Sequence, residues 1–163
     1  MAYIRIKKIN NKKYAYLVET INTKSGPRQK VKQYLGSVQV LEKKKEFFAI
    51  NKTFKDKKDI LSNLAIAELE SKGFKEKNNN YIYKNLIFSP KNFTLTKKTK
   101  SNTEKDMVIN INQGYICTFT LQRLLNFKKS KDFNKDAYNL AKHFLEAGLN
   151  ISKELFIDFY QKI

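Results

Sequence analysis

The N-terminal segment that decides the fold reads YIRIKKINNKKYAYLVETINTKSGPRQKVKQYLG over residues 3–36. It contains three strand-like runs with the period-two alternation of a strand that buries one face. The aliphatic positions that share one face are Ile4, Ile6, Ala15, Leu17, Val31 and Leu35. The opposite face carries Tyr3, Arg5, Lys7, Tyr14, Tyr16, Val18, Arg28, Lys30, Lys32 and Tyr34. This pattern predicts an antiparallel three-stranded meander with an aliphatic face turned inward and a basic, tyrosine-bearing face turned outward.

The residues between the three runs are typical of turns. Asn10 and Asn11 adopt positive φ at low cost, so they suit a tight hairpin between the first two runs. The segment from Thr23 to Pro27 predicts a longer loop, which Pro27 closes because proline donates no ladder hydrogen bond. The two connections are therefore of the kind that antiparallel neighbours use.

The outward face is strongly basic. Residues 1–36 hold nine Lys or Arg against the single acid Glu19, a net charge of +8. Like charges across strands destabilise a sheet, whereas phosphates would neutralise them and tyrosine rings could stack on bases. The expected nucleic-acid-binding residues are Arg5, Lys7, Lys8, Lys12, Tyr16, Arg28, Lys30, Lys32 and Tyr34. The alternative is a solvated sheet whose lysines prevent edge-to-edge aggregation.

A resemblance rests on three motifs: Tyr3-Ile4-Arg5-x-Lys7-Lys8, then Tyr14-x-Tyr16-Leu17-Val18-Glu19, then Lys30-Val31-Lys32-Gln33-Tyr34-Leu35-Gly36. The segment resembles the opening of many insertion-sequence transposases and the start of a group of small uncharacterised archaeal proteins. It covers about a fifth of the chain and implies a sheet that faces nucleic acid. The residues that the resemblance carries over are Arg5, Lys7, Tyr16, Lys30, Lys32 and Tyr34. The acidic-triad core of the transposases has no counterpart after Gly36, so the resemblance implies a mode of binding without the catalytic activity.

The whole chain has the composition of a folded, basic protein. Its 163 residues are 41% hydrophobic and carry a net charge of +18, which makes nucleic acid or an anionic surface the default partner. Thirty of its thirty-three basic residues are Lys, a bias that an AT-rich genome also produces. That bias explains Lys in place of Arg better than it explains the excess of positive charge. We expect an α+β fold with a basic three-stranded β module at 1–45 and an α+β body with a helical C-terminal part at 46–163.

The pattern after the meander predicts a mixture of helices and short strands. Asp56 and Asp59 are N-cap candidates for a helix at about 58–72, and Gly73 ends it. A second, smaller β meander follows, with strands at 74–77, 81–88 and 93–96. The remaining expected elements are a mobile basic loop at 97–105, a strand at 107–111, and helices at 114–127, 135–147 and 152–161. Gly148 is expected to end the second of these helices, and Ser152 is the N-cap candidate of the last one.

Apolar patches on the body predict a second class of function. Phe47, Phe48 and Phe54 form one patch, and the last helix presents Phe156 and Phe159. Contact with a protein partner, or self-association, through Phe47, Phe48, Phe156 and Phe159 is therefore the alternative to nucleic-acid binding.

Residues with catalytic or metal-binding chemistry are sparse. His143 is the only histidine and Cys117 the only cysteine, and no phosphate-binding glycine loop is present. We expect no enzyme activity, no metal site and no cofactor, with a magnesium-dependent nuclease using Asp106 as the minor alternative. The sequence has no apolar signal segment and no run of about 18 apolar residues, so we expect a cytoplasmic protein without membrane contact.

Overall fold

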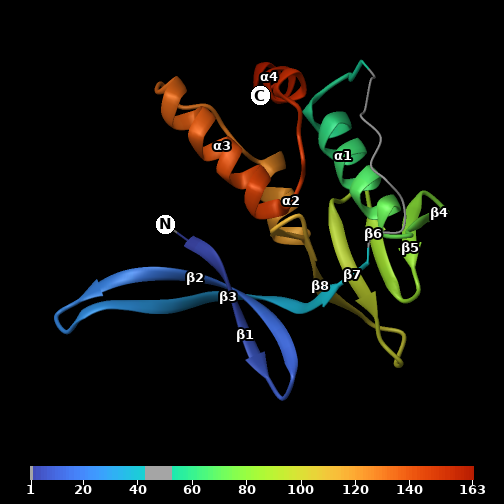
Figure 1. Cartoon of the computed structure of the whole chain (residues 1–163), viewed down its shortest axis with the longest axis horizontal. Helices are drawn as coiled ribbons and strands as arrows, with labels where there is room; N and C mark the ends of the chain where they lie inside the picture. Colours follow the sequence, from blue (N-terminus) through green and yellow to red (C-terminus); the bar gives the residue numbers. More distant parts are fainter. Residues whose placement is uncertain (1, 43–52) are drawn as a thin grey trace.

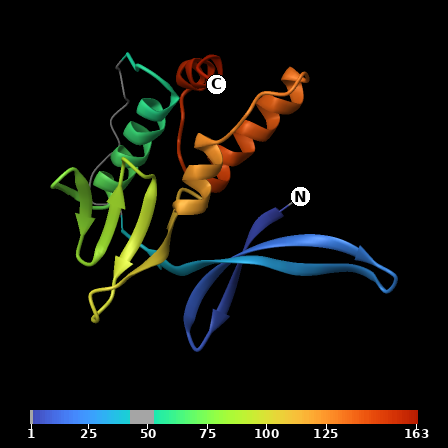
Figure 2. The same cartoon turned by 180° about the vertical axis from the view of Figure 1, so that it is seen from behind.

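The computed structural model describes residues 2–42 and 53–163. The fold is α+β, as predicted. Its described elements are β1 (Ala2–Ile9), β2 (Lys12–Thr23), β3 (Gly26–Val40), α1 (Lys57–Ser71), β4 (Lys75–Lys77), β5 (Asn80–Tyr83), β6 (Leu86–Ser89), β7 (Thr94–Lys98), β8 (Glu104–Ile111), β9 (Gly114–Cys117), α2 (Thr118–Leu125), α3 (Phe133–Ala147) and α4 (Lys153–Gln161). The N-terminal strands extend away from the helices, which gather at the other side of the molecule (Figures 1 and 2).

One sheet connects the N-terminal strands with the rest of the chain. Its strand order is β1-β2-β3-β8-β7-β6-β5-β4, and β9 pairs with β8 outside this path. β3 pairs with β8 in parallel, and the other pairs are antiparallel. A parallel pair needs a long crossover connection, which the segment with α1 and β4 to β7 supplies. The expected boundary between residues 45 and 46 lies outside the described residues, and the two expected parts share this sheet.

β1, β2 and β3 form the predicted antiparallel meander. The longer loop expected from Thr23 to Pro27 is instead a tight turn, because Thr23 pairs with Gly26 and Pro27 lies within β3 opposite Asn22. Asn10 and Asn11 have φ of 47° and 61°, which is the turn conformation expected of them. β3 is long because it has two partners: its first part pairs with β2, and residues Ser37 to Val40 pair with β8. Gly36, with φ of +125°, stands at this change of partner, and a Cβ there would clash with the backbone carbonyl of Asp106. β3 can therefore approach β8 only because residue 36 has no side chain.

The expected separation of β3 into a basic and an aliphatic face is wrong. Two register shifts interrupt the pairing of β2 with β3, between Ala15 and Tyr16 and again between Leu17 and Val18. A β-bulge adds a residue to one strand and reverses the alternation beyond it. Val31 therefore lies opposite Val18 and is 47% exposed instead of buried.

The same shifts place Arg28 and Lys30 of β3 on a different face from Tyr34. Arg28 and Lys30 lie opposite Ile21 and Glu19, on the pleat of β2 that also carries Leu17. Tyr34 lies opposite Tyr16, on the other pleat. The basic residues and the tyrosine that were predicted to share one face of this strand therefore lie on opposite faces.

The helix ends agree with the caps that the sequence indicates. The Asp56 carboxylate accepts a hydrogen bond from the backbone N–H of Asp59 at 2.9 Å and caps α1. Gly148 ends α3 in the left-handed conformation, and the Ser152 hydroxyl accepts from the backbone N–H of Leu155 at the start of α4. These signals involve residues three or four apart, so the sequence carries them in full.

Three expectations for the middle of the chain need correction. The strand expected at 81–88 is two strands, because Lys84 adopts φ of 54° and turns the chain between β5 and β6. The mobile loop expected at 97–105 is a hairpin formed by the ends of β7 and β8. The helix expected at 114–127 begins only at Thr118, since residues 114–117 pair with β8 as β9.

The core consists of two clusters. The larger one packs the helices against β6 to β9, and the smaller one lies under the meander, where Leu17 and Leu35 contact Val108 and Cys117. Phe54 and Phe159 belong to the larger cluster and are 4% and 0% exposed, so neither is available to a partner. Phe47 and Phe48 lie outside the described residues.

Candidate nucleic-acid interface

A cluster of three tyrosines occupies the outer face of the meander, the pleat opposite Ala15 and Leu17. We call Tyr14, Tyr16 and Tyr34 the tyrosine cluster. The ring centroid of Tyr34 lies 5.4 Å from that of Tyr16 and 6.4 Å from that of Tyr14. The cross-strand register places Tyr16 on β2 between Arg5 on β1 and Tyr34 on β3.

Basic side chains border this cluster on the side of β1. Lys7 lies directly opposite Tyr14, and its Nζ is 5.2 Å from the centroid of the Tyr16 ring. An ammonium over a tyrosine face is a favourable cation–π contact, which holds the lysine at the edge of the cluster. Partial burial and the neighbouring tyrosines raise the pKa of Tyr34 above its usual value of 10.0, so its hydroxyl stays neutral at physiological pH.

The hairpin of β7 and β8 borders Tyr34 on the other side. A cleft of about 430 Å³ separates them, which we call the Tyr34 cleft. It is lined by Tyr34, Ser37, Lys97, Thr99, Lys105 and Asp106. Lys97 and Lys105 are direct cross-strand neighbours, so two ammonium groups share one side of the cleft.

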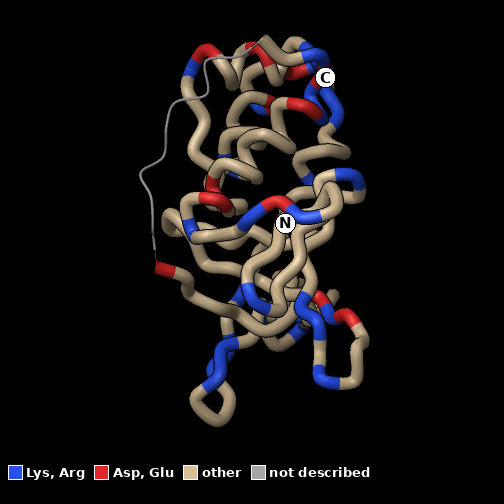
Figure 3. Tube along the Cα trace, turned by 90° about the vertical axis from the view of Figure 1, so that its right-hand side faces the viewer, with Lys and Arg blue, Asp and Glu red and all other residues tan. Residues whose placement is uncertain are grey.

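A second pair of lysines faces each other across the β1–β2 hairpin. Lys8 lies directly opposite Lys13, as Lys97 does opposite Lys105. Within the described part of the chain, none of these four lysines forms an ion pair. Both hairpins project at the end of the molecule away from α3 and α4, where Figure 3 shows their Lys and Arg in blue. Such pairs destabilise a hairpin unless an anion neutralises them.

The structure brings some of the predicted binding residues together and separates others. Those on the outer face, in the register of the tyrosine cluster, are Arg5, Lys7, Lys12, Tyr16 and Tyr34. Those on the opposite pleat are Lys8, Arg28 and Lys30. Lys32 forms an ion pair with Glu19 at 3.2 Å, and half of its side chain is exposed. The predicted set therefore surrounds the meander and does not form one surface.

Of the six residues that line the Tyr34 cleft, only Tyr34 was predicted from the sequence to bind nucleic acid. Lys97 and Lys105 belong to the stretch that was expected to be a mobile loop, and Ser37 was expected at the end of the sheet. The available signal was the lysines on both sides of the polar turn from Thr99 to Thr103, which is the pattern of a hairpin with exposed strand ends. Their proximity to Tyr34 depends on the pairing of β3 with β8, which no local pattern reveals.

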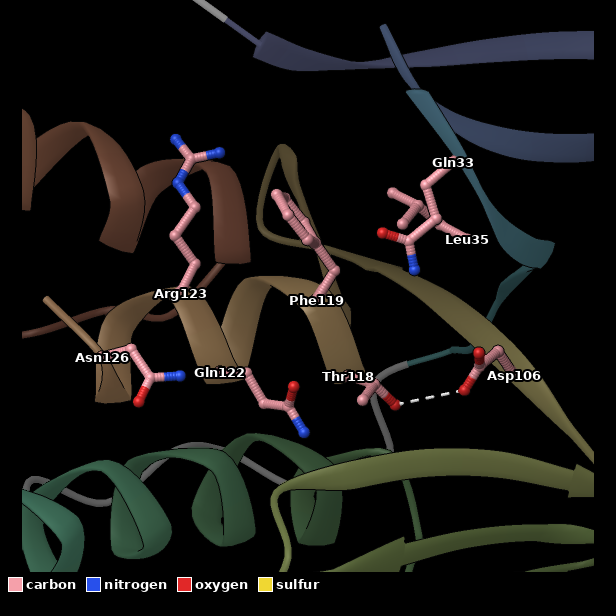
Figure 4. Close-up of a pocket in the computed structure, with 8 residues that line it drawn as sticks. All are labelled: Gln33, Leu35, Asp106, Thr118, Phe119, Gln122, Arg123 and Asn126. Carbon is pink, nitrogen blue, oxygen red and sulfur yellow. Dashed lines mark hydrogen bonds between the residues drawn. The ribbon is translucent and has the colours of Figure 1, made fainter. Parts of the chain in front are cut away.

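A second cleft lies between β3 and α2 (Figure 4). It has a volume of about 360 Å³ and is lined by Gln33, Leu35, Asp106, Thr118, Phe119, Gln122, Arg123 and Asn126. The Thr118 hydroxyl donates to a carboxylate oxygen of Asp106 at 3.5 Å. Its lining mixes polar side chains with the apolar Leu35 and Phe119, which belong to or pack against the smaller core cluster.

Arg123 serves to attach the meander to the helices. Its guanidinium pairs with a carboxylate oxygen of Glu146 at 2.8 Å, and both side chains are more than four-fifths buried. The other carboxylate oxygen of Glu146 accepts from the backbone N–H of Ile4 at 3.2 Å. Glu146 therefore joins β1, α2 and α3, and the charge of Arg123 is neutralised within the protein.

The described residues offer little for catalysis. No group of three or more His, Cys, Asp or Glu side chains among residues 2–42 and 53–163 could hold a metal ion. Burial, aided by Arg123 and Lys142, lowers the pKa of His143 to about 4, and its Nδ1 has no hydrogen-bond partner. Cys117 is buried, and burial raises the pKa of its thiol, which disfavours the reactive thiolate.

Comparisons with known proteins add no relative. No protein-family model matches the chain, and neither the curated proteins nor the solved structures contain a significant match. None of the helices in the described part of the chain is long and apolar enough to cross a membrane.

Proposed function

We propose that this protein binds nucleic acid through the outer face of the meander together with the β7–β8 hairpin, and that it acts by binding and not by catalysis. The observation that carries this proposal is the Tyr34 cleft, where Lys97 and Lys105 lie side by side next to a half-exposed tyrosine. Ammonium groups neutralise phosphates and release counterions, and an aromatic ring supplies contact area for a base. A cytoplasmic location fits such a partner.

The small number of arginines among the basic residues predicts weak sequence selectivity. The chain has three arginines, the side chains best suited to bidentate recognition of phosphate or guanine. Arg123 is engaged by Glu146, which leaves Arg5 and Arg28, and these lie on opposite pleats. Most contacts would therefore be point charges on phosphates, which position the nucleic acid without reading its sequence.

The test compares two triple variants with the same change of charge. Arg5→Gln/Lys7→Gln/Lys105→Gln removes three cations that border the tyrosine cluster. The control, Lys75→Gln/Lys131→Gln/Lys135→Gln, removes three exposed lysines of the body. Fluorescence anisotropy with labelled duplex DNA and a structured RNA, from about 50 to 200 mM salt, gives the slope of log affinity against log salt.

Each phosphate contact contributes about 0.9 to this slope on duplex DNA, so the first variant should lower it by roughly two to three units. The control variant should change it by less than about one unit. Equal slopes for the two variants would show that total charge, and not this face, drives the binding. A higher affinity for one of the two ligands identifies DNA or RNA as the partner.

The apolar surface of α3 and α4 favours a second candidate function, docking of a protein partner. Phe133, Tyr138 and Leu145 are 64%, 68% and 73% exposed along α3. Clefts of about 440 and 520 Å³ lie between α3 and α4, and Phe156 lines both. Sedimentation velocity over a range of concentrations tests self-association here, because Leu145→Asp would abolish any concentration-dependent dimer. A wild-type chain that stays monomeric removes self-association from this candidate.

A further inference from the structure

The tyrosine cluster has one ring that is free to receive a base. The rings of Tyr14 and Tyr16 are tilted by 44° and 53° to the ring of Tyr34 and pack against it, and Lys7 covers Tyr16. Tyr34 itself is 50% exposed and forms a wall of the Tyr34 cleft. The other two tyrosines thus hold the ring of Tyr34 in place while its own surface faces the cleft.

Cations lie on both sides of this ring. Lys97 and Lys105 stand across the cleft, and Lys7 and Arg5 lie on the other side, beyond Tyr16. A ring between two groups of cations has the same order as phosphate, base and phosphate along a nucleic-acid strand. Proteins that bind single strands combine these two elements, a basic track for the backbone and an aromatic ring for stacking.

A duplex would leave the ring unused. In a double helix the bases are stacked on each other, so a side chain reaches only their edges, and a tyrosine beside the phosphates has no base face to contact. An unpaired base can turn out of the strand and stack on the ring. The exposure of Tyr34 within a cleft bordered by lysines therefore favours a strand whose bases are unpaired.

We infer that the interface binds unpaired nucleotides, with one base stacked on Tyr34 in the Tyr34 cleft and the flanking phosphates at Lys97 and Lys105 on one side and at Lys7 on the other. This inference rests on the proposed function and names its ligand class: single-stranded RNA or an unpaired DNA segment. Both supply the same base and phosphate chemistry.

The test varies the ring at position 34 and leaves the charge unchanged. Tyr34→Leu removes the ring, and Tyr34→Phe is the matched control that keeps it. The ligands are labelled pyrimidine strands of about 12 nucleotides, as RNA and as DNA, and duplexes of the same length. Anisotropy at one fixed salt concentration measures each affinity, and thermal unfolding verifies that each variant is folded.

We expect both single strands to bind wild type more tightly than the duplexes. Tyr34→Leu should weaken single-strand binding roughly 5- to 150-fold, and Tyr34→Phe less than about 3-fold, because stacking needs the ring and not the hydroxyl. Duplex affinity should be the same for all three proteins. The single strand for which wild type has the higher affinity shows whether RNA or DNA is the preferred ligand.

A second measurement does not depend on a substitution. Ultraviolet cross-linking of wild type to an oligonucleotide that contains 4-thiouridine, followed by mass spectrometry, should place the cross-link on the peptide that contains Tyr34. Duplex binding as tight as single-strand binding, with an unchanged affinity for Tyr34→Leu, would overturn the inference. The proposed function would survive that result if Arg5→Gln/Lys7→Gln/Lys105→Gln still lowered the salt slope more than the control variant. It would fall if the two triple variants gave equal slopes or if no nucleic acid bound.

Discussion

The β7–β8 hairpin offers two neighbouring lysines whose substitution by Glu should have opposite effects on stability. Lys97 lies directly opposite Lys105, whereas Lys98 lies directly opposite Glu104. Lys97→Glu converts a repulsive cross-strand pair into an attractive one, and Lys98→Glu does the reverse. Cross-strand charge pairs contribute roughly 0.2–1 kcal/mol each, so the two variants should differ in free energy of unfolding by about 1–2 kcal/mol, with Lys97→Glu the more stable.

Urea unfolding of the two variants measures this difference directly. They have the same net charge, so long-range repulsion cancels, and at an m-value of about 2 kcal/mol/M the midpoints should differ by roughly 0.5–1 M urea. The difference should shrink near 1 M salt, where the Debye length is about 3 Å. Lys97→Glu should nevertheless bind nucleic acid more weakly than Lys98→Glu, because Lys97 lines the Tyr34 cleft. Equal midpoints of the two variants at low salt would show that the pair of Lys97 and Lys105 is not unfavourable. Equal affinities for nucleic acid would show that this pair does not contribute to binding.

Two further predictions concern the fold that supports the interface. Gly36→Ala should cost roughly 2–4 kcal/mol in urea unfolding, because a Cβ at Gly36 meets the backbone of Asp106. Gly26→Ala, also at positive φ but with nothing within 4 Å, should cost only about 1 kcal/mol, and equal costs would contradict the steric argument. For His143, the folded-state pKa of about 4 lies below the usual 6.5, so the unfolded chain binds more protons between these values and stability falls as the pH drops from about 6.5 to 4. The loss should be ~1 kcal/mol after allowance for solvent screening, and His143→Leu should remove it; an unchanged pH profile in that variant would assign the effect to other groups.

Sequence patterns were reliable where the signal is local. The hairpin at Asn10 and Asn11, the cap at Asp56 and the end of α3 at Gly148 each depend on residues within one turn of chain. In such places the side chain bonds to, or permits, the backbone conformation that defines the element. The order of the meander could be predicted for the same reason.

Predictions failed where partners distant in sequence decide the structure. Alternation placed Val31 on the buried face, but two bulges in the pairing with β2 turn it outward. Residues 114–117 were expected to begin a helix but form β9, because β8 offers them an antiparallel partner. The candidate site shows the same division. Tyr16 and Tyr34 could be found from the strand pattern, whereas Lys97 and Lys105 lie beside Tyr34 only because β3 pairs with β8.

The packing at Gly36 links the pairing of β3 with β8, which no local pattern reveals, to the proposed function. The residues on either side of Gly36 in β3 include Tyr34 and Ser37, and both line the Tyr34 cleft. Because Gly36 has no side chain, β3 can lie against β8 at Asp106, and this contact brings the β7–β8 hairpin beside Tyr34. Without that approach the meander would carry tyrosines and lysines but no cleft, and the hairpin would be the isolated basic loop that the sequence suggested. The backbone packing at Gly36 therefore determines both the continuity of the sheet and the position of the cations that the proposed ligand requires.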